Sequence, residues 1–193
     1  MREYLYALVA VVLFALFLTT FVVRTFYIPS ISMIPTLQVR DVVLADEFTY
    51  RLRPPRDGDV AIFTPPVQSQ PAEFIKRVIG VPGDTIRISD GMVYRNAVPL
   101  REPYENQPPK YDLEVANYGI YVDGRRLDAR RADVPPRALW QAPDRVPQGF
   151  YFMLGDNRNY SDDSHVWGFA KGPGFTGRAL LVLWPFSRFT ILR

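Results

Sequence analysis

The fold class of the chain is indicated most clearly by residues 85–95, which read TIRISDGMVYR. Apolar and polar residues alternate on both sides of Asp90-Gly91, a pair that suits the tight turn between two antiparallel strands. A second Asp-Gly pair stands between two short segments at 120–127. These two β-hairpin signals predict a body built from short antiparallel strands.

Other segments of strand length lie along the chain, and an apolar run near the C-terminus stops at Pro185. The additional strands expected from these segments cover 41–44, 60–63, 74–79 and 179–184. We therefore expect a mainly β fold with a barrel-like antiparallel β-sheet. Between about 99 and 147 the pattern loosens around two Pro-Pro pairs, which indicates a β-ribbon or cap inserted into this body.

Composition excludes several classes of protein. The chain of 193 residues has no cysteine, which excludes disulfide scaffolds, thiolate zinc sites and cysteine nucleophiles. A single histidine, His165, leaves too few ligands for a histidine-rich metal site, so no metal is expected. The net charge is only +3 and the basic residues are scattered, which does not indicate a nucleic-acid groove.

The N-terminal stretch of residues 4–23 contains no charged side chain. As a helix it would extend roughly 30 Å, which matches the hydrocarbon thickness of a bilayer. A buried core helix would be expected to keep a polar face, and a cleaved signal peptide would have a shorter apolar region before a small-x-small motif. We therefore predict a single permanent membrane span, with 1–27 as an N-terminal transmembrane anchor and 28–193 as the β domain.

Lys76 lies within the expected strand 74–79, between apolar neighbours. Alternation along a strand places Lys76 on the same face as Phe74 and Val78. An ammonium group in apolar surroundings loses hydration, which lowers its pKa and favours the neutral amine, and a neutral amine can act as a general base. The alternative interpretation is an edge-strand lysine whose amine reaches solvent.

Two serines, Ser30 and Ser32, alternate with apolar residues just after the predicted span. Prolines on either side of them favour extended backbone, and alternation would then place both hydroxyls on one face. One hydroxyl could attack a substrate while the other donates a hydrogen bond to the developing oxyanion. On spacing alone, an ordinary serine-rich linker next to the membrane is the favoured interpretation.

A third polar stretch, residues 155–168, stands between apolar residues and is typical of a structured loop. Its acidic residues do not have the regular spacing of a calcium-binding loop, and Arg158 would repel a cation. A Ser-His-Asp triad that uses His165 is a further alternative, and it would depend on the only imidazole in the chain.

Taken together, the three segments resemble the bacterial type I signal peptidases, membrane-anchored serine endopeptidases with a Ser–Lys dyad. Residues 30–37 are similar to the family's nucleophile box, and the resemblance makes Ser32, the serine before Met33, the nucleophile. It also implies an oxyanion hole formed by Ser30 and Ser32. Residues 76–84 are similar to the lysine box, in which Lys76 takes the position of the general base.

Residues 155–168 are similar to the third conserved box of the family. By this resemblance, Ser161 orients the lysine, and Asp156, Arg158 and Asp163 support the site. One residue departs from the family pattern. His165 stands where the family usually has an arginine that pairs with the aspartate two residues earlier. A neutral imidazole can still hydrogen-bond a carboxylate, but it lacks a fixed charge and the bidentate fork of arginine.

The resemblance implies a membrane-bound endopeptidase that removes signal peptides from exported preproteins, without a cofactor. It implies a single-pass protein of the cytoplasmic membrane, with the lipid bilayer as a partner and the catalytic domain on the extracytoplasmic side. Oligomeric state stays open. Two alternatives also stay open: a histidine-dependent serine hydrolase, and a membrane-tethered β domain that binds peptides without cutting them.

Overall fold

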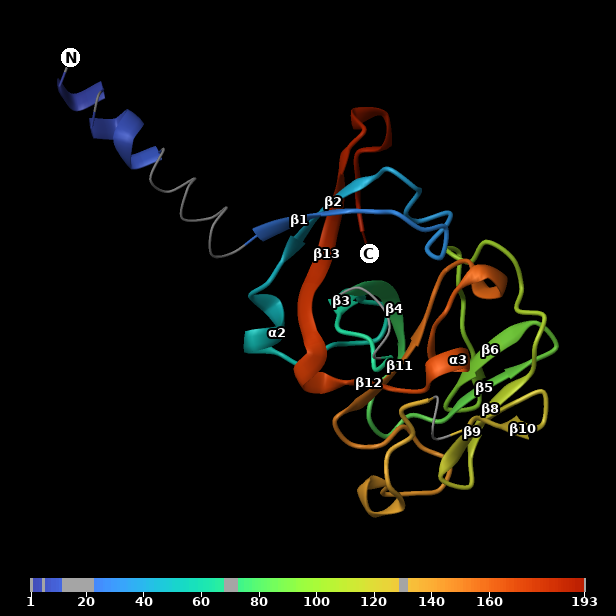
Figure 1. Ribbon diagram of the computed structural model, residues 1–193. Helices are drawn as coiled ribbons and strands as arrows, with labels where there is room; N and C mark the ends of the chain where they lie inside the picture. Colours follow the sequence, from blue (N-terminus) through green and yellow to red (C-terminus); the bar gives the residue numbers. More distant parts are fainter. Residues whose placement is uncertain (1, 5, 12–22, 68–72, 129–131, 193) are drawn as a thin grey trace.

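The computed structural model describes residues 2–4, 6–11, 23–67, 73–128 and 132–192. The described part of the chain is mainly β, as expected, and its strands form two antiparallel sheets. Figure 1 shows the two sheets, with the N-terminal residues extending away from them. Short helical segments lie in the connections: α2 (Thr49–Leu52), η1 (Arg137–Leu139), η2 (Arg158–Tyr160), α3 (Ser164–Trp167), η3 (Gly172–Gly174) and η4 (Phe186–Arg188).

The larger sheet has eight strands and carries the expected strands at 60–63, 74–79 and 179–184. Its path has two ends among the described strands, so it is an open sheet rather than a closed barrel. In Figure 1 the long β13 arches along one side of it. The order along the path is β1 (Val23–Tyr27), β2 (Val42–Asp46), β13 (Phe175–Trp184), β3 (Val60–Phe63), β4 (Phe74–Gly80), β11 (Phe150–Leu154) and β12 (Ala170–Lys171), and β14 (Thr190–Ile191) pairs with β13.

The smaller sheet confirms both predicted hairpins. Asp90 and Gly91 have φ angles of 52° and 72°, which is the left-handed backbone that an Asp-Gly turn provides. The strands of the region 99–147 join this sheet through the pairing of β8 with β5. Its order is β10 (Arg125–Arg126), β9 (Gly119–Val122), β8 (Leu113–Ala116), β5 (Ile86–Ser89), β6 (Met92–Arg95) and β7 (Val98–Pro99).

At the N-terminus, residues 2–4 and 6–11 are helical. Much of the predicted span, residues 12–22, lies outside the described residues. Within the ranges that the structure does describe, no helix is both long and apolar enough to cross a membrane. Residues 23–27, which the sequence analysis places at the end of the anchor, form strand β1 and pair with β2.

Three apolar clusters form the core, and β4 contributes to all of them. Ile75 packs against a cluster beneath residues 28–37, Val78 belongs to a second cluster with Phe63, and Ile79 belongs to a third cluster at the smaller sheet. β4 also lies between β3 and β11 in the larger sheet. A polar side chain on β4 is therefore held by packed neighbours on several sides.

Candidate active site

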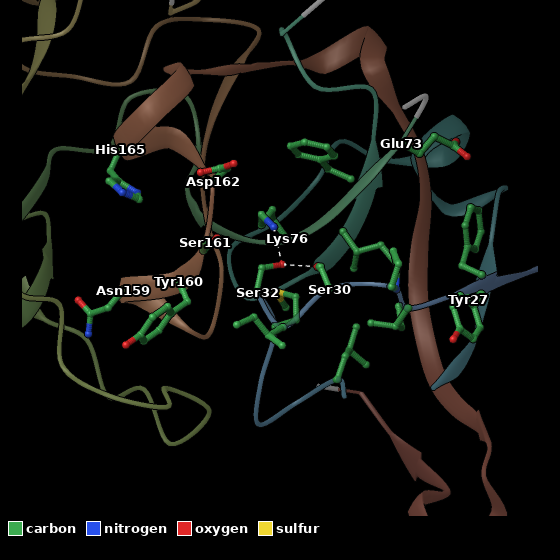
Figure 2. Close-up of a pocket in the computed structure, with 18 residues that line it drawn as sticks. Tyr27, Ser30, Ser32, Glu73, Lys76, Asn159, Tyr160, Ser161, Asp162 and His165 are labelled. Carbon is green, nitrogen blue, oxygen red and sulfur yellow. Dashed lines mark hydrogen bonds between the residues drawn. The ribbon is translucent and has the colours of Figure 1, made fainter. Parts of the chain in front are cut away.

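Ser32 and Lys76 meet in the folded chain although 44 residues separate them. The Lys76 amine donates a hydrogen bond to Ser32 Oγ at 2.6 Å. Lys76 is 5% exposed and Ser32 is 7% exposed. Figure 2 shows the two side chains facing each other across the floor of a cavity. The snorkelling interpretation of Lys76 is wrong, because its amine is buried against a hydroxyl instead of reaching water.

Burial favours the neutral form of the Lys76 amine. Desolvation lowers the pKa of Lys76, and the nearby carboxylates of Asp163, Asp162 and Asp156 only partly oppose this shift. The Phe74 ring, whose centre lies 5.4 Å from the Lys76 amine, supplies part of the apolar surroundings. Among the described residues, the hydrogen-bond partners of the Ser32 hydroxyl are Lys76 and Ser30. A histidine-dependent hydrolase would need His165 in this position, so the structure does not favour that alternative.

Ser30 and Ser32 lie close together, with 3.2 Å between their hydroxyl oxygens. The expectation of extended backbone is wrong beyond this point, because residues 32–36 form a turn. The Leu37 amide donates to the Met33 carbonyl at 2.8 Å, and both side chains enter the apolar core. Burial of these two apolar residues explains the turn, and it fixes the segment that carries Ser32.

Asp156 joins the three segments that the sequence analysis singled out. Its fully buried carboxylate accepts hydrogen bonds from Arg77 Nε at 2.9 Å and from Arg77 Nη2 at 2.7 Å. The hydroxyl of Thr36, in the nucleophile segment, also donates to this carboxylate. The sequence analysis gave Arg77 no role, although alternation on β4 directs it away from Lys76 and a buried arginine needs a carboxylate partner.

The loop at 155–157 holds the backbone of the nucleophile segment. The Asn157 amide donates to the Ser32 carbonyl at 3.0 Å, and its side chain donates to the Ile31 carbonyl at 3.1 Å. A Cβ on Gly155 would lie 2.2 Å from Ser161 Oγ and 2.5 Å from the Ser32 carbonyl oxygen. Glycine at this position therefore permits the close approach of Ser32 and Ser161.

The structure places Ser161 in the same cavity as Lys76, as Figure 2 shows. The Ser161 hydroxyl is buried, and it has no hydrogen-bond partner among the described residues. The structure therefore brings the expected orienting residue to the site, without a hydrogen bond between it and the lysine.

His165 does pair with Asp163, the residue that its usual arginine counterpart would hold. His165 Nδ1 lies 2.7 Å from Asp163 Oδ1, and its ring stacks on Tyr111 with centroids 4.5 Å apart. Asp163 is fully buried and also accepts a hydrogen bond from the Gly155 amide at 2.9 Å. The imidazole thus keeps a contact with Asp163, through one nitrogen instead of a fork.

Arg158 is fully buried, and its carboxylate partner is Glu102. Two parallel bonds of 2.8 Å join its guanidinium to the Glu102 carboxylate. Its Nε donates to the Gly155 carbonyl at 3.0 Å. The sequence analysis missed Glu102, because no local pattern between residues 99 and 147 marks a site.

A cavity of about 630 Å³ opens over the Ser32 hydroxyl. It extends from β1, near Tyr27, past Ser32 and Lys76 to residues 159–162. Most of the side chains between Tyr27 and the two catalytic candidates are apolar, and Figure 2 shows the labelled polar groups around them. Within the described part of the chain, no cluster of His, Asp and Glu side chains is suited to a metal ion.

These features together define a class of enzyme. A buried amine that favours its neutral form can accept the proton of the serine hydroxyl to which it is bonded. A second hydroxyl 3.2 Å away can donate to an oxyanion. The open cavity gives a peptide access to both groups. This arrangement can support acyl transfer with a serine nucleophile and a lysine base.

Comparisons with known proteins lead to the same class. The family described as "Signal peptidase, peptidase S26" matches residues 1–184. The probable signal peptidase I-1 of Synechocystis sp. is 37% identical over 193 residues, which cover 97% of this chain and 84% of that protein. The signal peptidase I of Leptolyngbya laminosa is 38% identical over 183 residues, covering 92% of this chain and 76% of the relative. The chain belongs to the signal peptidase family, and within this family it is a type I signal peptidase.

Proposed function

We propose that this signal peptidase cleaves signal peptides from exported preproteins with Ser32 as the nucleophile and Lys76 as the general base. The observation that carries the assignment is the buried 2.6 Å hydrogen bond between these two side chains. Burial also lowers the pKa of Lys76, which favours the neutral amine that a general base requires.

In the proposed acylation step, neutral Lys76 takes the proton from Ser32 Oγ while this oxygen attacks the scissile carbonyl carbon. The Ser30 hydroxyl and the Ser32 amide then donate hydrogen bonds to the oxyanion. The protonated Lys76 passes its proton to the leaving amine as the carbon–nitrogen bond breaks. The products are a free amine, which begins the mature protein, and an ester between the signal peptide and Ser32.

Deacylation repeats this sequence with water. Lys76, neutral again, takes a proton from a water molecule that attacks the ester carbon, and returns it to Ser32 Oγ as the bond between this oxygen and the carbon breaks, which releases the signal peptide with a free carboxyl group. Ser161 lines the same cavity as Lys76, and we assign its hydroxyl the role of orienting the amine. Asp156, Arg158 and Asp163 act at a distance from the reacting atoms, because their bonds hold the loop that contacts the Ser32 backbone.

The cavity suits an extended peptide. It runs along β1 and the beginning of β4, so a substrate strand can lie between Tyr27 and Ile75 and present its scissile carbonyl at Ser32. Small residues at the first and third positions before the cut, as the family resemblance implies, would place little volume against the apolar side chains of this cavity.

We further propose that the protein is anchored in the cytoplasmic membrane through residues 4–23, with its β body on the extracytoplasmic side in contact with lipid. The C-terminal hairpin formed by β13, η4 and β14 exposes Trp184, Phe186, Phe189 and Ile191. Through β2, β13 is connected to β1, the strand that follows the predicted span. Exposed aromatic side chains at this position fit the interfacial region of a bilayer.

Two measurements test these assignments. The full-length protein in detergent is incubated with a preprotein, and the product is measured by mass. We expect a shortened product from the wild type and none from Ser32→Ala, with circular dichroism showing both proteins folded. Cleavage by folded Ser32→Ala at the wild-type rate would exclude Ser32 as nucleophile.

The test of anchoring washes isolated membranes that carry the protein with high salt and then with carbonate. Release of the protein by these washes would contradict an integral span.

A further inference from the structure

Residues 102–111, which we call the brace segment, contact the third box at several points along the length of that box. The Asn106 side chain donates to Asn157 Oδ1 at 3.2 Å, and its amide donates to the Asp156 carbonyl at 2.9 Å. Further along, the Lys110 amide donates to Asn159 Oδ1 at 2.8 Å. The Tyr111 ring then stacks on His165. Both segments run side by side, so the brace segment supports the loop that holds the site.

Glu102 makes the strongest of these contacts. Its carboxylate accepts a hydrogen bond of 2.8 Å from each of the two terminal nitrogens of Arg158. The Glu102 side chain is 4% exposed and the Arg158 side chain is 0% exposed. A bidentate pair between buried charged groups is directional as well as strong. Removing one partner would leave the other charge buried without compensation. The orientation of the Arg158 side chain therefore depends on Glu102.

Arg158 in turn connects this carboxylate to the nucleophile. Its Nε donates to the Gly155 carbonyl at 3.0 Å, and two residues later the Asn157 amide donates to the Ser32 carbonyl at 3.0 Å. Gly155 also lies against Ser161 and Ser32 closely enough to exclude a Cβ. A displacement of the loop at Gly155 would thus be transmitted to the backbone that carries the attacking oxygen.

From these contacts we infer that Glu102 is a positioning residue for signal-peptide cleavage, acting through Arg158 on the geometry of Ser32. The inference rests on the proposed function of Ser32 and Lys76. Glu102 does not line the cavity, so it does not contact a bound peptide there. It is also absent from the groups that shift the pKa of Lys76. Its effect should therefore appear in the rate of the chemical step, and not in substrate affinity or in the pH profile.

The test compares Glu102→Gln with Glu105→Gln in the full-length protein, with a peptide that spans a cleavage site. Glu105 carries the same charge and lies 3.8 Å from Arg158 Nη1, but Glu105 Oε1 makes no hydrogen bond among the described residues. We expect Glu102→Gln to lower kcat by about 10- to 100-fold, the scale on which small misplacements of reacting groups act. KM and the pH of half-maximal rate should stay as in the wild type, and Glu105→Gln should keep kcat within about twofold.

Two further variants separate positioning from loss of folding. Glu102→Asp keeps the charge and should retain more of kcat than Glu102→Gln, and both are assayed below their melting temperatures. The double variant Glu102→Gln/Arg158→Gln should lose no more kcat than the worse of its two single variants, because both act through one contact. Additive losses would overturn the inference, as would folded Glu102→Gln with wild-type kcat while Ser32→Ala is inactive. A wild type that does not cleave the peptide would overturn the proposed function as well.

Discussion

β4 and β5 are consecutive strands of similar composition, yet they lie in different surroundings. Residues 76–80 of β4 are buried without interruption, as are all residues of its neighbours β3 and β11. On β5, by contrast, buried Ile86 and Ile88 alternate with exposed Arg87. Both strands carry basic side chains. The side chain of Arg87 lies in solvent, whereas those of Lys76 and Arg77 are enclosed on β4.

This difference teaches where the chemistry of a β protein can be located. A sheet that is packed on both faces removes water from any cation it carries, and desolvation is the main cause of the lowered pKa of Lys76. A sheet with one solvated face leaves the basic side chains on that face in contact with water. We expect substitutions on β4 to change catalysis, and substitutions on β5 to change stability alone.

The largest effect is expected from Lys76→Arg. The substitution keeps the positive charge on β4, but a guanidinium does not lose its proton in a protein and cannot serve as the base. We expect kcat to fall by about 10²- to 10⁴-fold, the usual contribution of a general base, while the protein stays folded. The measurement is kcat on a preprotein with circular dichroism as the control. Near-normal turnover by folded Lys76→Arg would contradict the base assignment.

The pH dependence of the wild type is the next largest effect. The active form of Lys76 is the neutral one, so activity must rise as pH rises towards the pKa of this amine. Burial lowers this pKa, so the inflection should lie below the ordinary lysine value of about 10.4. Well below the inflection, kcat/KM should fall about tenfold for each pH unit. A kcat/KM that stays constant or falls as pH rises towards this inflection would be incompatible with Lys76 as base.

Gly155→Ala should have an intermediate effect, because it acts on the loop and not on the reacting atoms. The added Cβ would lie 2.5 Å from the Ser32 carbonyl oxygen and 2.2 Å from Ser161 Oγ, so one of these groups must move. We expect kcat to fall by about 10- to 100-fold. Gly124→Ala is the control, since nothing lies within 4 Å of its Cβ position, although its φ of +73° adds strain in the turn. Equal loss of kcat in both variants would argue against a specific role of Gly155.

The smallest effects on catalysis are expected on β5. Arg87→Ala should change the free energy of unfolding by less than about 0.5 kcal/mol, because its side chain is exposed. Ile88→Ala, on the opposite face of the same strand, should cost about 2–5 kcal/mol through the cavity that it leaves in the core. Chemical denaturation measures both values. Neither variant should change kcat per folded molecule, and a tenfold loss in either would remove the distinction between the two strands.

Much of the fold could be predicted where local chemistry determines it. Asp-Gly pairs marked two hairpins, and alternation on 74–79 placed Lys76 opposite Arg77. Other turns carried no such signal. Tyr118 and Ala97 adopt left-handed backbone with φ angles of 59° and 64°, a conformation for which neither residue has an intrinsic preference. The strands that these turns connect, β8 with β9 and β6 with β7, are stabilised by pairing that a local pattern does not contain.

The candidate site divides in the same way. Ser30, Ser32 and Lys76 were candidates from their sequence surroundings, but a serine-rich linker and a solvent-exposed lysine fitted the same patterns, and only the resemblance of three separate segments to one family selected these residues. Glu102 could not be selected in this way, since its importance comes from Arg158, a partner 56 residues away. Buried ion pairs of this kind depend on the tertiary fold that brings both charges together.

The contacts of Ser32 also bear on when the enzyme can first act. Ser32 leaves the ribosome early, but its carbonyl is held by Asn157, and β2 must wait for β13 to provide its partner in the sheet. Long-range pairings of this kind form only after the distant segment has been synthesised. A growing polypeptide that stops before residue 157 therefore has the nucleophile without the Asn157 contact and without β13, so the site is assembled only after these distant segments have been synthesised.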